Sequence, residues 1–156
     1  MFKTLKELFS KKQKTVPPEI LVIFDGDQVS VKLYKKFYDK KTDKIKHVWA
    51  HGRDMTPKGL PLDKLEVKTA YRFGKESTDK LVGIIIAKEC SQNPKIKEVH
   101  VVSGDGDTID TCATLALEFG NVKFTSVHIN TRVKKRGIDA FLKRVPSNCN
   151  FVSISA

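Results

Sequence analysis

The run Ile20-Leu21-Val22-Ile23-Phe24 is followed at once by Asp25-Gly26-Asp27, and this stretch decides the fold. Five consecutive apolar residues, rather than alternating ones, are typical of a strand buried on both faces of a parallel sheet. A carboxylate placed directly after such a strand costs free energy unless something binds it. The stretch therefore predicts a central strand whose carboxyl end carries a functional acid.

Apolar runs and helical spacings alternate along the rest of the chain. The patterns predict further strands at 45–50, 67–71, 99–102 and 122–129, an edge strand at 150–154, a loop at 52–65, and helices at 29–38, 77–91, 107–119 and 137–142. Alternation of this kind indicates a parallel sheet covered by helices and joined by right-handed crossovers. The expected fold is a Rossmann-like α/β three-layer sandwich with a central, mostly parallel sheet.

The first 18 residues differ from the remainder. Their apolar side chains share one face of a helix, and a lysine-rich stretch leads to Pro17-Pro18. We expect residues 1–18 to form a basic amphipathic helix and a proline linker, and residues 19–156 to form one domain. The helix would dock on the domain, contact a partner or another copy of the chain, or touch a membrane surface.

Composition narrows the class of protein. The chain has 156 residues, of which 29 are Lys or Arg and 18 are Asp or Glu, so its formal charge is +11. Such a charge attracts polyanions such as nucleic acid, or an anionic membrane surface, although a solvated lysine-rich surface is the alternative. No run approaches the roughly 20 apolar residues of a membrane helix, so no transmembrane segment is expected.

Cysteine usage indicates the compartment and excludes one kind of metal site. Cys90, Cys112 and Cys149 are scattered, odd in number and not part of any Cys-x-x-Cys pair. Neither a disulfide framework nor a zinc site is therefore expected. A reducing, cytoplasmic location fits this pattern.

Five acids fall where the predicted elements begin or end. Asp25 and Asp27 follow the first strand, Asp105 and Asp107 follow the strand at 99–102, and Asp79 lies in the first turn of a helix. Because ligands of such sheets bind outside the carboxyl ends of the strands, these acids should meet at one edge. Clustered carboxylates repel one another, and Mg²⁺ or Mn²⁺, which prefer oxygen ligands, would relieve that repulsion.

Each acid also has a local alternative role. Asp27 would cap the helix that starts near Val29, and Asp79 would favour a helix N-terminus through the dipole. Asp105-Gly106-Asp107 would form a turn, where Asp and Gly are favoured. Asp25 has no comparable local role.

Three of these segments resemble motifs of the NYN and PIN-like nuclease superfamily. Residues 23–28, Ile-Phe-Asp-Gly-Asp-Gln, resemble its first-strand Asp-Gly-x-Asn motif, and residues 75–79, Lys-Glu-Ser-Thr-Asp, its Lys-x-x-Asp helix start. Residues 101–107, Val-Val-Ser-Gly-Asp-Gly-Asp, resemble its Ser-Gly-Asp-x-Asp motif. The likeness extends over about 20–129, and it departs at Gln28, at the Lys-to-Asp spacing and at Thr108-Ile109-Asp110.

The resemblance implies a PIN-like fold and a metal-dependent ribonuclease. It makes Asp25, Asp79, Asp105 and Asp107 the catalytic and Mg²⁺- or Mn²⁺-binding residues. Ser103 would be a supporting polar group and Asp27 a helper. The expected partner is nucleic acid, RNA rather than DNA, and a member that binds nucleic acid without cutting it is an alternative.

A second family shares part of the pattern. Phe24-Asp25-Gly26-Asp27-Gln28-Val29 fits the first motif of haloacid dehalogenase-type phosphatases, and 104–110 fits their last one. In that interpretation Asp25 is the nucleophile and Asp27 the acid/base. No separate Ser/Thr motif precedes the last motif, and the chain has little room for a cap, which favours the nuclease interpretation.

Basic and aromatic residues supply candidates for nucleic-acid contact. Arg132, Lys134, Lys135 and Arg136 follow a predicted strand at the same edge as the acids, where they would hold phosphates or form a solvated loop. Aromatic side chains can stack on bases, or they can belong to the core. The candidates of this kind are Tyr34, Tyr38, Trp49 and Tyr71.

Overall fold

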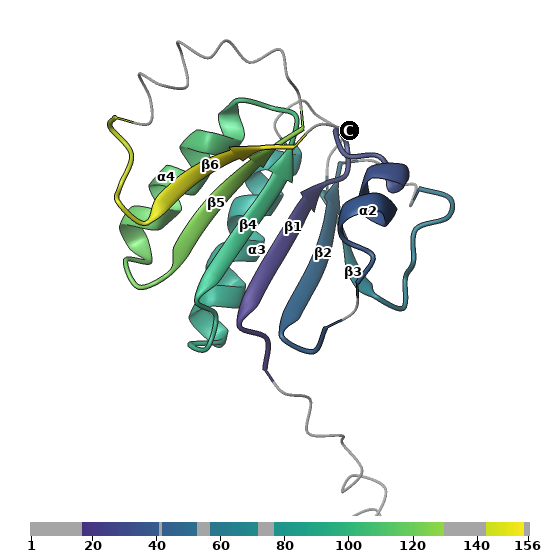
Figure 1. The fold of residues 1–156 in the computed structure, drawn as a ribbon, viewed down its shortest axis with the longest axis horizontal. Coiled ribbons are helices and arrows are strands. Elements are labelled where there is room, and N and C mark those ends of the chain that lie inside the picture. The colour runs from purple at the N-terminus through teal and green to yellow at the C-terminus, as the bar shows by residue number, and fades with distance from the viewer. Residues whose placement is uncertain (1–16, 41, 53–56, 72–76, 130–142, 155–156) are drawn as a thin grey trace, which may run out of the picture.

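The computed structural model describes residues 17–40, 42–52, 57–71, 77–129 and 143–154 (Figure 1). Three predictions lie wholly or largely outside these ranges: the N-terminal helix within 1–18, the short helix at 137–142, and the basic residues at 132–136.

Six strands form one sheet, and every neighbouring pair is parallel. This confirms the Rossmann-like prediction and makes the sheet fully, rather than mostly, parallel in the described part of the chain. The strands are β1 (Ile20–Asp25), β2 (Ile45–His51), β3 (Leu65–Thr69), β4 (Glu98–Ser103), β5 (Lys123–His128) and β6 (Cys149–Ser153).

The strand order is β3-β2-β1-β4-β5-β6 (Figure 1). The chain builds outward from β1 in one direction through β2 and β3, and then returns to the other side of β1 with β4. The order therefore reverses between β1 and β4. In open α/β sheets this switch point opens a crevice outside the carboxyl ends of the two strands, where ligands bind.

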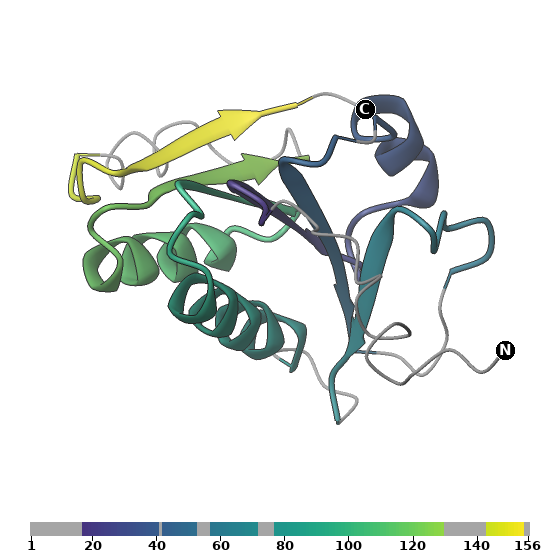
Figure 2. The same ribbon diagram turned by 90° about the horizontal axis from the view of Figure 1, so that it is seen from below.

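Helices cover both faces of the sheet, which gives three layers (Figure 2). α3 (Ser77–Gln92) packs under β1 and β2, and α4 (Asp107–Glu118) lies beside it under β5 and β6. α2 (Val31–Phe37) lies on the opposite face. Among the described residues, no helix is long and apolar enough to cross a membrane.

The core has two halves because β1 sends alternate side chains to the two faces. Leu21 and Ile23 pack with residues of α3 and α4, whereas Val22 and Phe24 pack with Tyr34 and other residues on the α2 face. All of these side chains are buried. The unbroken apolar run that predicted a strand covered on both faces is thereby confirmed.

Aromatic residues of the α2 face belong mainly to the core. Tyr34 and Trp49 are fully buried around Phe24, and Tyr38 packs beside them. The core alternative is therefore confirmed for Tyr34 and Trp49, and the base-stacking alternative is wrong for these two side chains. Tyr71, two residues after β3, is 99% exposed.

Two elements begin two residues away from the position that the sequence predicts. α2 begins at Val31 and not at Val29, because the Ser30 hydroxyl accepts a hydrogen bond from Leu33 N at 3.1 Å and caps the helix. The prediction that Asp27 caps this helix is therefore wrong. The third strand spans Leu65–Thr69, two residues earlier than predicted, because those residues pair in register with His47–His51 of β2.

Candidate metal centre

The predicted acids meet at the carboxyl edge of the sheet, at its switch point. Asp25 is the last residue of β1, and Ser103 is the last residue of the neighbouring β4. Beyond Ser103 the chain turns through Gly104–Gly106 and enters α4 at Asp107. α3 approaches the same place with its first turn, which contains Asp79. Three segments distant in sequence thus supply carboxylates to one small region.

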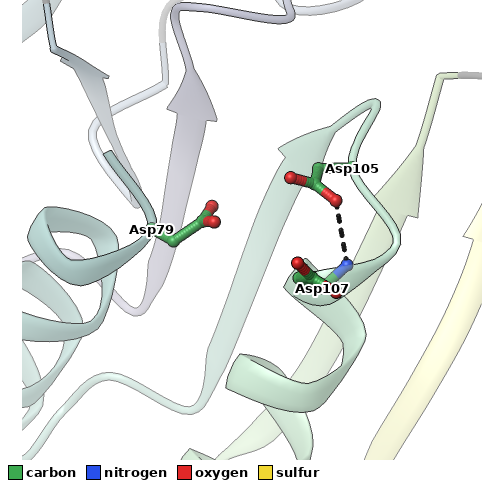
Figure 3. A group of neighbouring side chains, drawn as sticks. All are labelled: Asp79, Asp105 and Asp107. Atoms are coloured by element: carbon green, nitrogen blue, oxygen red, sulfur yellow. Dashed lines mark hydrogen bonds between the residues drawn. The ribbon is translucent and has the colours of Figure 1, made fainter. Parts of the chain in front are cut away.

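Asp79, Asp105 and Asp107 form a group that we call the acidic triad (Figure 3). One carboxylate oxygen from each residue lies within 4.8 Å of the corresponding oxygen of the other two. Asp79 points from α3 across a gap toward the two acids at the start of α4. Asp79 and Asp105 are partly buried, and Asp107 is exposed, so the triad opens to solvent on one side.

Local hydrogen bonds hold the two acids of the β4–α4 turn. The Ser103 hydroxyl accepts from Asp105 N at 3.1 Å, and Asp105 Oδ1 accepts from Asp107 N at 3.1 Å (Figure 3). Gly106 caps α4 without any side-chain hydrogen bond. Asp105-Gly106-Asp107 therefore forms the turn that its composition predicted, and the turn presents both carboxylates to Asp79.

Asp25 shares the Ser103 hydroxyl with Asp105 and is only 4% exposed. Its Oδ2 accepts from the Ser103 hydroxyl at 2.8 Å, and its Oδ1 accepts from Asp27 N at 3.2 Å. Burial raises the pKa of the Asp25 carboxyl above its ordinary value, and the charges of Asp27 and Asp105 add to that effect, while the two hydrogen bonds oppose it. Asp25 is outside the triad, but it lines one pocket together with Asp79.

Asp27 also lies outside the triad. Its Oδ2 accepts from the Thr78 hydroxyl at 2.5 Å, and its Oδ1 accepts from Gly52 N at 3.4 Å. Asp27 therefore joins the turn after β1 to the end of β2 and to the first turn of α3. The contact of Asp27 with Thr78, 51 positions away, has no sequence signal.

Further residues of the site escaped sequence analysis. Gly26 lies against the buried Trp49 indole, and a Cβ at this position would come within 2.2 Å of Trp49 Nε1. The pocket that Asp25 and Asp79 line is completed by Val82, Val101, Thr108 and Thr111. Thr108 and Thr111 follow Asp107 at one and four positions, a helical spacing that would have placed them on the same side of α4.

The donor set fits a hard divalent cation. Carboxylate oxygens are the preferred protein ligands of Mg²⁺, and oxygens on opposite sides of an octahedral ion lie about 4.2 Å apart. The 4.8 Å limit of the triad is near that span. The N-termini of α3 and α4 also favour negative charge, so part of the repulsion among the acids is relieved without an ion.

Comparison with known proteins adds little to this geometry. No protein-family model and no curated protein matches the chain at a significant level. One solved structure that resembles it is the complex between a UDP-glucosyltransferase from Polygonum tinctorium, capable of glucosylating indoxyl, and 3,4-dichloroaniline. The identity is 13% and the TM-score 0.38, over 75% of this chain and 30% of that one. The chain thus spans under a third of that protein's length.

Proposed function

We propose that this protein is a metal-dependent nuclease that hydrolyses phosphodiester bonds, with RNA as the preferred substrate. The observation that carries the proposal is the acidic triad, in which three carboxylates from α3 and the β4–α4 turn converge at the switch point of a parallel sheet. The motif resemblance of residues 23–28, 75–79 and 101–107 gives the site its reaction class.

The chain's own residues have distinct roles in this proposal. Asp79, Asp105 and Asp107 hold Mg²⁺ or Mn²⁺, and Asp25 completes the acidic wall of the pocket below them. Ser103 orients Asp25 and the Asp105 backbone at the same time. When bound, such an ion activates water for attack on phosphorus and stabilises the leaving oxygen.

The substrate side of the proposal rests on charge and on one aromatic residue. A formal charge of +11 draws a polyanion toward an acidic site that would otherwise repel it. Tyr71 follows β3 at the same edge of the sheet and exposes its ring to solvent. We assign phosphate contact to Arg132, Lys134, Lys135 and Arg136. We also propose that the protein works in the reducing cytoplasm, where its three cysteines stay free.

Incubation of the purified protein with single-stranded RNA, with and without Mn²⁺, tests the proposal. Cleavage is expected with Mn²⁺, and it should disappear in Asp105→Asn and Asp79→Asn. Asp110→Asn is the matched control, because Asp110 is exposed on the first turn of α4 but lies outside the triad. Equal cleavage by wild type and by the triad variants would assign the activity to a contaminant and reject the proposal.

The phosphatase alternative predicts different behaviour. It needs Asp25 as a nucleophile and Asp27 as an acid/base. Trapping with beryllium fluoride and turnover of a generic phosphomonoester separate it from the nuclease. RNA binding that weakens steeply with salt and leads to no cleavage would indicate a binding module instead.

A further inference from the structure

Asp27 ties together three separate segments at the edge of the sheet. Its carboxylate accepts from the Thr78 hydroxyl at the start of α3 and from the backbone of Gly52 after β2. Its own backbone N–H donates to Asp25 Oδ1 at the end of β1. Thr78 is 4% exposed, so its hydroxyl has little access to water as an alternative partner.

The Asp27–Thr78 hydrogen bond links the first turn of α3 to the turn that follows β1. Thr78 directly precedes Asp79, the one member of the acidic triad that α3 contributes. Asp105 and Asp107 are held independently, by Ser103 and by their own turn. The distance between Asp79 and the other two acids therefore depends on how α3 is anchored.

The contacts around Gly52 leave little freedom in this anchor. A Cβ on Gly52 would lie 3.1 Å from the Thr78 hydroxyl and 3.3 Å from Asp27 Oδ2. The glycine backbone thus comes close to both partners of the hydrogen bond, and the three groups pack as one unit.

We propose that Asp27 is a positioning residue, which acts through Thr78 to set Asp79 at metal-binding distance from Asp105 and Asp107. The inference rests on the metal-binding part of the proposed function. Asp27 donates no ligand to the ion. Its carboxylate serves as a hydrogen-bond acceptor, so the oxygen that faces Thr78 matters and the negative charge does not.

Substitutions separate positioning from ligation. Asp27→Asn keeps an amide oxygen that can accept from Thr78, whereas Asp27→Ala removes the acceptor. Thr78→Val removes the donor with almost no change in shape, and Thr78→Ser restores a hydroxyl. If Asp27 acts through Thr78, both removals damage the site and the two conservative variants leave it intact.

The experiment measures Mn²⁺ affinity by calorimetry or by electron paramagnetic resonance, with RNA cleavage recorded in parallel. Asp27→Ala and Thr78→Val should each weaken Mn²⁺ binding about tenfold, the lower end of what loss of an outer-shell contact costs. The double variant should bind Mn²⁺ no more weakly than Asp27→Ala alone, because Asp27→Ala already removes the Thr78 hydrogen bond together with the longer one from Gly52 N. Asp27→Asn and Thr78→Ser should stay close to wild type.

Amide hydrogen exchange supplies a readout that needs no metal. In the ion-free protein, exchange in the first turn of α3 should speed up in Thr78→Val and stay unchanged in Asp27→Asn. Thr78→Val keeps the side-chain volume, so it reports on the hydrogen bond even if Asp27→Ala fails to fold.

Each outcome either supports or overturns the proposal that Asp27 is a positioning residue. Loss of Mn²⁺ affinity in Asp27→Asn as large as in Asp79→Asn would make Asp27 a ligand and overturn the inference. Wild-type affinity in Thr78→Val, or no Mn²⁺ binding by the wild-type protein, would overturn it as well. Mn²⁺ binding with the expected pattern but without RNA cleavage would reject the nuclease and leave Asp27 as a positioning residue.

Discussion

The Ser103 hydroxyl donates to Asp25 Oδ2 over 2.8 Å and so joins the end of β4 to the end of β1 at the switch point. The same oxygen accepts from Asp105 N. In Ser103→Ala both bonds are lost, and a buried carboxylate loses one of its two donors. We expect the free energy of unfolding to fall by about 1–3 kcal/mol, the cost of leaving a buried polar group without its partner.

Ser126 provides a matched control for this prediction. Like Ser103 it is 1% exposed and lies on a central strand, β5, but its hydroxyl has no hydrogen-bond partner among the described residues. Ser126→Ala should therefore be neutral or slightly stabilising. Urea unfolding of the two variants measures the difference, and an equal loss in both would show that the Ser103 bridge contributes nothing.

Gly26 must remain a glycine because of the Trp49 indole. A methyl group at this position would approach Trp49 Nε1 to 2.2 Å, and Trp49 is fully buried and cannot move aside. Gly26→Ala should destabilise the protein by about 1–3 kcal/mol, as overpacking of a core does. Fluorescence of Trp49, the single tryptophan, reports both the unfolding midpoint and the displaced ring.

The same substitution at Gly83 should raise the stability of the protein and not lower it. Gly83 lies inside α3, and a Cβ there would meet nothing within 4 Å. Gly83→Ala should stabilise by about 0.5–1 kcal/mol, because alanine is the better helix former. Destabilisation by Gly83→Ala would contradict the open space around Gly83, and unchanged stability in Gly26→Ala would argue against the described packing around Gly26.

The fold was predictable because its decisive signals are local. The apolar run that became β1 and the run that became β4, interrupted only by His100, are each followed by acids, and a parallel sheet brings their ends to one edge. Asp25, Asp105 and Asp107 could be assigned to one region on that basis. The same argument places Asp79 there, because it lies in the first turn of a helix that follows a strand.

The contacts that shape the site were not predictable in this way. The Ser103–Asp25 bond depends on β4 lying beside β1, and the Asp27–Thr78 bond depends on the docking of α3. Neither hydrogen bond produces a periodic pattern in the sequence. The assignment of Asp27 as a cap failed for a different reason, since Ser30 competes for the same helix and is nearer to its first free N–H groups.

Metal binding should be visible as thermal stabilisation. An ion present at a hundred times its dissociation constant adds about 2.7 kcal/mol to the stability of the folded state. For a chain of this size that corresponds to a rise in Tm of roughly 5–10 °C. We expect Mn²⁺ to produce this shift in the wild type and in Asp110→Asn but not in Asp105→Asn, and a shift that survives in Asp105→Asn would place the ion elsewhere.

The cysteines should be poorly reactive in the folded protein. Burial raises the pKa of the Cys90 thiol to about 11, and it raises the pKa values of Cys112 and Cys149 as well. Because the thiolate is the reactive form, alkylation at pH 8 should be roughly tenfold slower than for a free thiol and should accelerate as the pH rises toward 11. Mass spectrometry of native and guanidine-unfolded protein measures this, and rapid labelling of native Cys112 would contradict its place under the sheet.

Tyr71 offers a direct test of nucleic-acid contact at the edge that carries the acids. The residue follows β3, which is two strands from β1 and hence about 10 Å away along the sheet. Base stacking on an exposed ring contributes about 1–3 kcal/mol, so Tyr71→Ala should weaken binding of single-stranded RNA at least about fivefold. Tyr71→Phe should bind like the wild type, since the ring and not the hydroxyl stacks, and Mn²⁺ affinity should be unchanged in both. Wild-type RNA affinity in Tyr71→Ala would show that the bound strand does not cross β3.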